Sequence, residues 1–120
     1  MKDLNILRQV GILVDSAIAE LGGLDVYEDI LDTFYTENIK RLEDIQQAKQ
    51  MDNLNLYKIY VHAMKSESAY LGMNKLSEMA FNHQLKCEEQ DTNYINEHYP
   101  ELIEEVNKIL DAIKAYLDIK

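Results

Sequence analysis

The sequence has little of what interrupts a helix or crosslinks a chain. Its 120 residues include four glycines, one proline and one cysteine. So few glycines and prolines favour helix as the secondary structure of most of the chain. Cys87 is alone, which excludes an intramolecular disulfide and suits a reducing compartment.

Basic side chains and long apolar runs are also scarce. Lys and Arg number 12 against 22 Asp and Glu, a formal net charge of −10. Phosphate backbones and anionic lipids are bound by clustered Lys and Arg, so this balance argues against nucleic-acid or membrane binding. No apolar run of about eighteen residues could span a membrane, and no signal-peptide pattern opens the chain. We therefore expect a cytoplasmic protein.

The length fits one domain, residues 1–120, with one hydrophobic core. A long helix is predicted over residues 25–48, because Asp25 and Glu28 form an N-terminal capping pattern after a pair of glycines. A weaker helical pattern covers residues 14–21, and the segment before it could pack as a short lid. The apolar side chains on which these predictions rest are Leu4, Leu7 and Val10 in the lid, and Tyr27, Ile30, Leu31, Phe34, Leu42 and Ile45 in the long helix.

Three more helices are predicted after the polar break at residues 51–53. They cover about 54–71, about 74–89, and a C-terminal stretch capped by Asp91 or Thr92, in which Pro100 should end, start or kink a helix. Four amphipathic helices with short connections pack most simply around one core. We expect an all-α fold, an antiparallel, up-and-down four-helix bundle with a short N-terminal helical extension.

The second of these four helices carries His62. Because each helical residue advances about 100°, one set of residues, most of them apolar, falls on the half opposite His62, and a set of small, polar or basic residues lies within about 60° of it. His62 should therefore be exposed to solvent between two lysines. The residues opposite are Tyr57, Tyr60, Val61, Met64, Ser68 and Leu71; those beside it are Asn55, Lys58, Lys65, Ser66 and Ala69.

This setting suits phosphoryl chemistry. A neutral imidazole is a nucleophile near neutral pH. Attack on a phosphoryl group needs open access, a nearby cation and small neighbours that admit a partner. Lys65 and Lys58 would supply the charge, while Ser66 and Ala69 would leave room.

The stretch HAMKSESAYLG, residues 62–72, closely resembles the signature of histidine-containing phosphotransfer (HPt) domains, which reads His, two residues, Lys, small residues and a closing Gly. AIAELGG followed by DVYEDILDTFY is similar to the beginning of such domains. LSEMAFNHQLKCEEQDTNYINEHYPELIEEV is similar to their continuation at the end of hybrid sensor kinases. Two positions depart from the pattern: Ser66, where many members have Gly, and Glu67, where a small or neutral residue is commoner and which could tune receiver docking.

The resemblance implies a phosphorelay carrier that moves a phosphoryl group between the aspartates of two receiver domains. His62 would be phosphorylated, Lys65 would stabilise the phosphate, and Ser66 and Gly72 would be structural. The implied partners are response-regulator receivers and a hybrid sensor histidine kinase. Mg²⁺ would belong to the receiver, so the chain itself would need no cofactor. Without a Gly-rich ATP loop it would be a carrier, not an enzyme, and we expect a monomer.

Two alternatives remain. His83 and Cys87 are four residues apart on one helix, a spacing that can share zinc. Two ligands are too few, and His98 or Glu88 could join only through the fold, so we expect no metal site, a partly buried cysteine and a surface histidine. The other alternative is a non-catalytic helical adaptor module in which His62 is incidental.

Overall fold

A computed structural model describes residues 2–119, and these residues contain helices and connecting loops only. The predicted all-α fold is therefore confirmed. The helices are α1 (Asn5–Arg8), α2 (Val14–Leu21), α3 (Leu24–Gln50), α4 (Leu54–Tyr70), α5 (Asn74–Glu88) and α6 (Thr92–Leu117).

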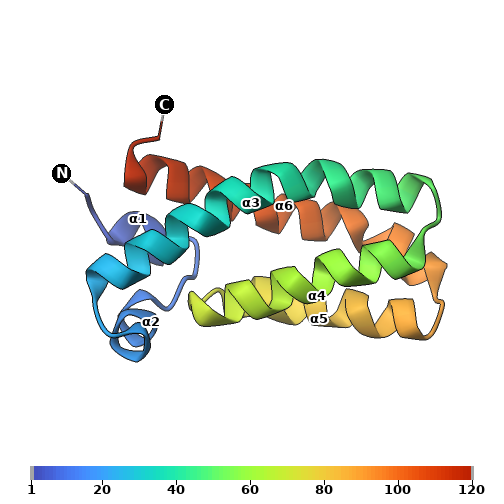
Figure 1. The fold of residues 1–120 in the computed structure, drawn as a ribbon, viewed down its shortest axis with the longest axis horizontal. Helices are drawn as coiled ribbons and strands as arrows, with labels where there is room; N and C mark the ends of the chain where they lie inside the picture. The colour runs from blue at the N-terminus through green and yellow to red at the C-terminus, as the bar shows by residue number, and fades with distance from the viewer. Residues whose placement is uncertain (1, 120) are drawn as a thin grey trace.

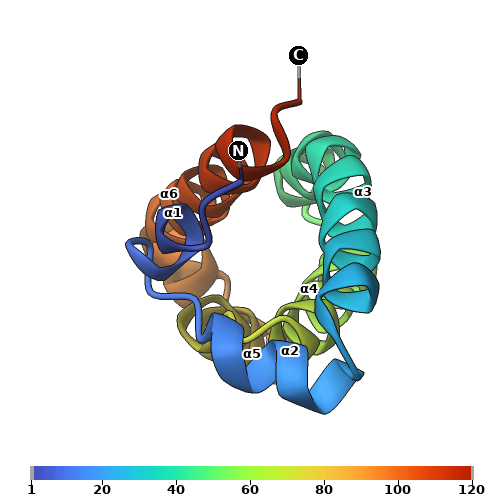
Figure 2. The ribbon, with the colours of Figure 1, turned by 90° about the vertical axis from the view of Figure 1, so that its left-hand side faces the viewer.

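The four long helices α3 to α6 pack in the order of the chain, and α6 returns to contact α3 (Figure 1). Seen along the long axis they form a ring, with the short helices α1 and α2 at one end (Figure 2). Helix α1 packs against α6, and α2 packs against α3. The predicted lid is thus a short helix whose Leu7 is fully buried.

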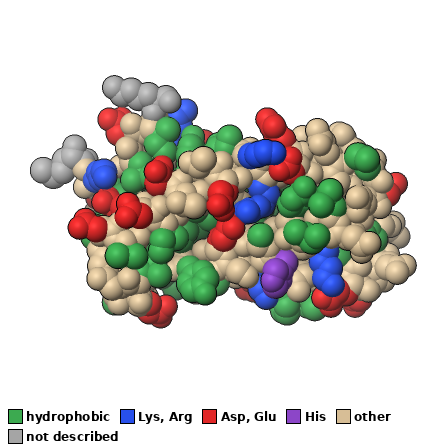
Figure 3. Space-filling view, viewed as in Figure 1, with side chains coloured by type: hydrophobic (Ala, Val, Ile, Leu, Met, Phe, Trp, Pro, Cys, Tyr) green, Lys and Arg blue, Asp and Glu red, His purple; other side chains and the backbone are tan. Residues whose placement is uncertain are grey.

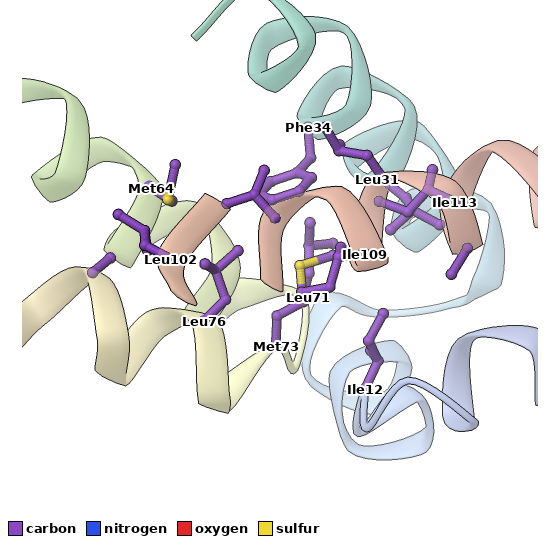
Figure 4. Close-up of a cluster of buried hydrophobic side chains, with 14 of the residues drawn as sticks. Ile12, Leu31, Phe34, Met64, Leu71, Met73, Leu76, Leu102, Ile109 and Ile113 are labelled. Atoms are coloured by element: carbon purple, nitrogen blue, oxygen red, sulfur yellow. The ribbon is translucent and has the colours of Figure 1, made fainter. Parts of the chain in front are cut away.

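Apolar side chains from every long helix fill the centre of the ring. Figure 4 shows Met64 of α4, Leu76 of α5 and Leu102 of α6 converging there, with Phe34 of α3 beside them. These side chains are at most 2% exposed. The inward stripes predicted from the sequence therefore meet in one core, which holds each helix in a definite rotation.

One predicted helix start is corrected. Helix α3 begins at Leu24 after Gly23, and no side chain caps it. Glu28, which was predicted to cap the helix, instead accepts a hydrogen bond at 2.8 Å from the hydroxyl of Tyr116, a residue distant in the sequence. Pro100 lies inside α6, which continues through it, so of the three predicted roles only a kink remains. The cap at Asp91 is confirmed, since its Oδ1 accepts from the Tyr94 backbone N–H at 3.1 Å.

Within residues 2–119, none of the helices is both long enough and apolar enough to cross a membrane.

Candidate functional site

The site is built on the hairpin of α4 and α5. Helix α4 begins where the Asn53 side chain accepts a hydrogen bond from the Leu56 backbone N–H at 3.1 Å. It ends before Gly72, which adopts a φ of +78°. That left-handed geometry, which glycine adopts without strain, turns the chain directly into α5.

The short turn gives the two helices a simple register. Residues equally distant from Met73 face each other: Lys65 faces Phe81, His62 faces Gln84 and Lys58 faces Glu88. The three positions on each helix are spaced by three and four residues, so each set forms one stripe. A row of polar and aromatic pairs therefore runs along the outer seam of the hairpin.

His62 is exposed, as predicted, and the opposite half of α4 is buried. Tyr57, Val61, Met64 and Ser68 are at most 1% exposed, while Tyr60 is half-buried. On the face seen in Figure 3, one histidine side chain reaches the surface with Lys or Arg side chains close to it and hydrophobic side chains nearby. The helix thus keeps its imidazole accessible while its other face anchors it in the core.

The imidazole of His62 is held from one side. Its Nδ1 lies 2.9 Å from Oε1 of Gln84 on α5. An amide oxygen only accepts hydrogen bonds, so we assign the hydrogen to Nδ1. In the neutral ring Nε2 then carries a lone pair, and this nitrogen is the nucleophilic one.

The two lysines beside His62 contact α5. Lys58 Nζ lies 3.2 Å from Oε1 of Glu88, and Lys65 Nζ lies 4.9 Å from the centre of the Phe81 ring. The predicted position of His62 between two lysines is confirmed, and the charge of Lys58 is partly neutralised by Glu88. Lys65 contacts an aromatic face, and within residues 2–119 it forms no ion pair.

The small residues occupy the positions expected of them. Ser66 is half-buried and Ala69 is exposed, so neither covers His62. Gly72 is buried, and a Cβ added to it would lie 2.6 Å from the Leu13 backbone oxygen. The Leu13 backbone N–H in turn donates to the Gly72 oxygen at 3.0 Å. Gly72 is thus required by both its backbone angle and the close approach of the segment before α2.

Glu67, the unusual residue of the signature, points towards α3. Its carboxylate accepts two hydrogen bonds from Arg41, at 2.6 and 3.1 Å. The same carboxylate accepts from the fully buried Asn38 amide at 3.4 Å. A two-bond Arg–carboxylate pair fixes geometry better than a single contact, so Glu67 ties α4 to α3.

The alternative site at His83 and Cys87 is buried. His83 is 2% exposed and Cys87 is 6% exposed, so the expectation of a surface histidine is wrong. His83 Nδ1 lies 2.9 Å from the Tyr57 hydroxyl. Among residues 2–119, no third His, Cys, Asp or Glu is close enough to form a metal-binding group with this pair. Burial lowers the pKa of His83 to about 4 and raises that of Cys87 to about 11.

Gln84 is the site residue that sequence reasoning missed. The signal was present, because a hairpin that turns at Met73 brings residues equally far from it together. Finding Gln84 required the exact length of the turn, and a difference of one residue would have rotated α5 by about 100°. The motif itself carries no information about the facing helix.

The chain matches the family described as Hpt domain over residues 29–116. The match covers well over half of the chain and includes His62, so the chain belongs to the Hpt domain family. The comparisons with curated proteins and with solved structures found no significant match. Hpt domains take part in histidine phosphotransfer in phosphorelay signalling, interact with receiver domains and kinases, and carry phosphoryl groups without an ATP-binding catalytic site of their own.

Proposed function

We propose that this chain is a phosphorelay intermediate that accepts a phosphoryl group on His62 from the aspartate of one receiver domain and passes it to the aspartate of another. The observation that carries the proposal is the exposed imidazole whose Nδ1 is held by Gln84 at 2.9 Å. This contact directs the lone pair of Nε2 away from α5. Membership in the Hpt domain family supplies the reaction class.

The transfer balances without an additional base. The Nε2 lone pair attacks phosphorus, the N–P bond forms, the P–O bond to the aspartate breaks, and the aspartate leaves as a carboxylate. The hydrogen on Nδ1 remains in its bond to Gln84, so the ring becomes positively charged and Oε1 of Gln84 stabilises that charge. Lys65 offsets the charge of the incoming phosphoryl oxygens. Transfer to the second receiver reverses these steps.

The surface around His62 suits a protein partner. Ile59, one turn before His62, is 61% exposed, and Phe81 and Leu85 on α5 are 40% and 38% exposed. Exposed apolar side chains around a polar centre favour docking of another protein, and the small Ser66 and Ala69 leave room for its active site.

The remaining features of the proposal follow from this role. The partners are response-regulator receivers and a hybrid sensor histidine kinase, and the receiver brings the Mg²⁺ in its own carboxylates. We place the protein in the cytoplasm, as a monomeric single domain built on an antiparallel four-helix bundle. The contact of α6 with α3, which closes the ring, supports the four-helix bundle.

The direct test is incubation of the purified chain with a phosphorylated receiver domain, followed by mapping of the phosphate. We expect acid-labile, base-stable phosphate on His62 and its loss when a second, unphosphorylated receiver is added. A chain that folds but takes up no phosphate from any receiver offered would instead support the non-catalytic adaptor module.

A further inference from the structure

The side chain of Gln84 has two different ends, and the one that faces His62 decides which ring nitrogen is nucleophilic. With Oε1 facing Nδ1, the hydrogen lies on Nδ1 and Nε2 has the lone pair. With the amide reversed, the NH₂ group would donate to Nδ1, and the neutral ring would carry its hydrogen on Nε2. The solvent-facing nitrogen could then not attack phosphorus. Something must therefore hold the amide in one orientation.

Glu88 is in the right place to do so. It lies four residues after Gln84 on α5, the spacing at which side chains of one helix are neighbours. Lys58 of α4 binds its Oε1 at 3.2 Å, which keeps the carboxylate on the same seam as the His62–Gln84 pair. A carboxylate only accepts hydrogen bonds, so it attracts the NH₂ end of the Gln84 amide and repels the oxygen end.

The charge state of Glu88 agrees with this arrangement. The hydrogen bond and charge of Lys58 lower the pKa of the Glu88 carboxyl, and the nearby Gln84 side chain contributes in the same direction. The group is therefore ionised at neutral pH, and the carboxylate remains an acceptor.

We propose that Glu88 is a positioning residue for His62. It holds the Gln84 amide with Oε1 towards Nδ1, and Lys58 holds Glu88, so the row Lys58–Glu88–Gln84–His62 keeps the lone pair on Nε2. The importance of this row for phosphotransfer rests on the function proposed above, whereas its effect on the ring does not. Glu88 needs no contact with the phosphoryl group in order to act.

The test compares Glu88→Ala with Glu89→Ala on the full chain. Both variants remove one exposed carboxylate from the end of α5, but Glu89 pairs with Lys86 instead of a residue of the row. Nitrogen-15 NMR at a pH where the imidazole is neutral reports which ring nitrogen of His62 carries the hydrogen. We expect the Nδ1–H form to dominate in the parent and in Glu89→Ala. In Glu88→Ala its ratio to the Nε2–H form should fall about two- to tenfold, the equilibrium change that one net hydrogen bond represents.

A second pair of variants separates orientation from ion pairing. Glu88→Gln keeps an acceptor oxygen for the Gln84 amide but loses the Lys58 ion pair, so it should keep more of the Nδ1–H form than Glu88→Ala does. In Lys58→Ala the carboxylate is still present, and the ring should stay mainly in the Nδ1–H form. An unchanged tautomer ratio in Glu88→Ala, or an equal change in Glu89→Ala, would overturn the proposal.

Phosphotransfer rates then distinguish this inference from the function itself. If the parent chain accepts phosphate and Glu88→Ala does so more slowly in proportion to its loss of the Nδ1–H form, both stand. If the parent takes up no phosphate, the function fails while the NMR comparison still decides the role of Glu88. If the parent is active and Glu88→Ala matches it in both rate and tautomer ratio, the function stands and the inference fails.

Discussion

His62 and His83 lie on the two helices of one hairpin, and each has its Nδ1 2.9 Å from an oxygen of the facing helix. Their surroundings differ. His62 is exposed, and its Nδ1 donates to an amide oxygen. His83 is 2% exposed, and its Nδ1 is hydrogen-bonded to the Tyr57 hydroxyl. The two imidazoles thus share a hydrogen bond to the facing helix and differ in their exposure to solvent.

Burial accounts for the chemical difference. The core around His83 disfavours its charged form, and this lowers its pKa to about 4. An imidazole that stays neutral and enclosed contributes packing and a hydrogen bond, whereas an exposed one can meet a partner. Whether a histidine in this fold is structural or reactive therefore depends on whether its face of the helix is buried or exposed. A hydrogen bond to the facing helix does not distinguish the two roles, because both histidines have one.

The sharpest test of the comparison exchanges each histidine for glutamine. His62→Gln should abolish phosphate uptake, because it removes the imidazole that attacks phosphorus, and it should leave helicity and melting temperature nearly unchanged. His83→Gln should keep His62 as the phosphorylated residue. Labelling by a phosphorylated receiver, with circular dichroism on the same samples, measures both. Label that persists on His62→Gln, or that appears on His83 or His98, would contradict the assignment.

The two faces of α4 should respond differently to the same new charge. Met64 is fully buried, so Met64→Asp places an unpaired carboxylate in the core and should lower the free energy of unfolding by at least about 3 kcal/mol. Ala69→Asp is the matched control, because Ala69 is exposed on the same helix. Urea denaturation measures the free energy of unfolding of the two variants. Equal stabilities would mean that α4 is rotated and that His62 is not outward-facing.

Glycine at the end of α4 should be less replaceable than glycine at the end of α2. Gly72 and Gly22 both have positive φ, +78° and +92°, but only at Gly72 would a Cβ meet backbone, 2.6 Å from the Leu13 oxygen. Gly72→Ala should therefore lower the free energy of unfolding by about 2–4 kcal/mol, backbone strain plus a clash. Gly22→Ala should cost about 1 kcal/mol, the strain alone. Similar losses in chemical denaturation would show that the Leu13 contact yields without cost.

Acid should destabilise the folded protein through His83. The folded-state pKa of His83, about 4, is below its ordinary value of 6.5, so the unfolded chain binds more protons between these values. Its contribution to stability is fully present above about pH 6.5 and is lost as the pH falls towards about 4. At about 1.4 kcal/mol per pKa unit, the loss approaches about 3 kcal/mol.

Urea denaturation between neutral pH and pH 4 measures this loss. Carboxyl groups titrate in the parent and in the variants alike, so the difference between proteins isolates the histidine. The parent should lose stability more steeply than His83→Gln as the pH falls. Parallel curves for these two proteins would contradict the assignment of a neutral, buried His83.

The smallest effects belong to the two lysines. Lys65→Ala should slow phosphotransfer or shorten the phosphohistidine lifetime by about two- to tenfold, the factor that about 0.4–1.4 kcal/mol represents. Lys58→Ala should do less, because Glu88 already neutralises part of its charge. Raising the salt concentration should reduce both effects, since exposed charges are screened beyond about 8 Å at physiological ionic strength. A larger loss at Lys58, or rates independent of salt, would overturn this ranking.

The helices and the outward face of α4 were predictable from local patterns. Helix α2 has the predicted bounds, Val14–Leu21, and α4 begins at the predicted Leu54. Helical periodicity placed Met64 inside and His62 outside because both positions follow from about 100° per residue and from the burial of apolar side chains. The HxxK spacing indicated the family, which the match over residues 29–116 confirms.

His83 was expected at the surface, but the structure buries it on α5 together with Leu76, Ala80 and Cys87. Tyr57 supplies the hydrogen bond that makes this burial tolerable, and Tyr57 lies 26 residues away in the sequence. The sequence around His83 does not reveal so distant a partner.

The sequence by itself determined the helical periodicity, the rotation of α4 and the signature around His62, since these depend on residues within a few turns of one another. Only the tertiary structure decided what each side chain faces. Gln84 is hydrogen-bonded to His62, Glu88 forms an ion pair with Lys58, and Glu28 accepts a hydrogen bond from Tyr116. All three contacts exist because turn lengths and core packing set the register between helices. That register depends on the whole core at once, and a local pattern cannot contain it.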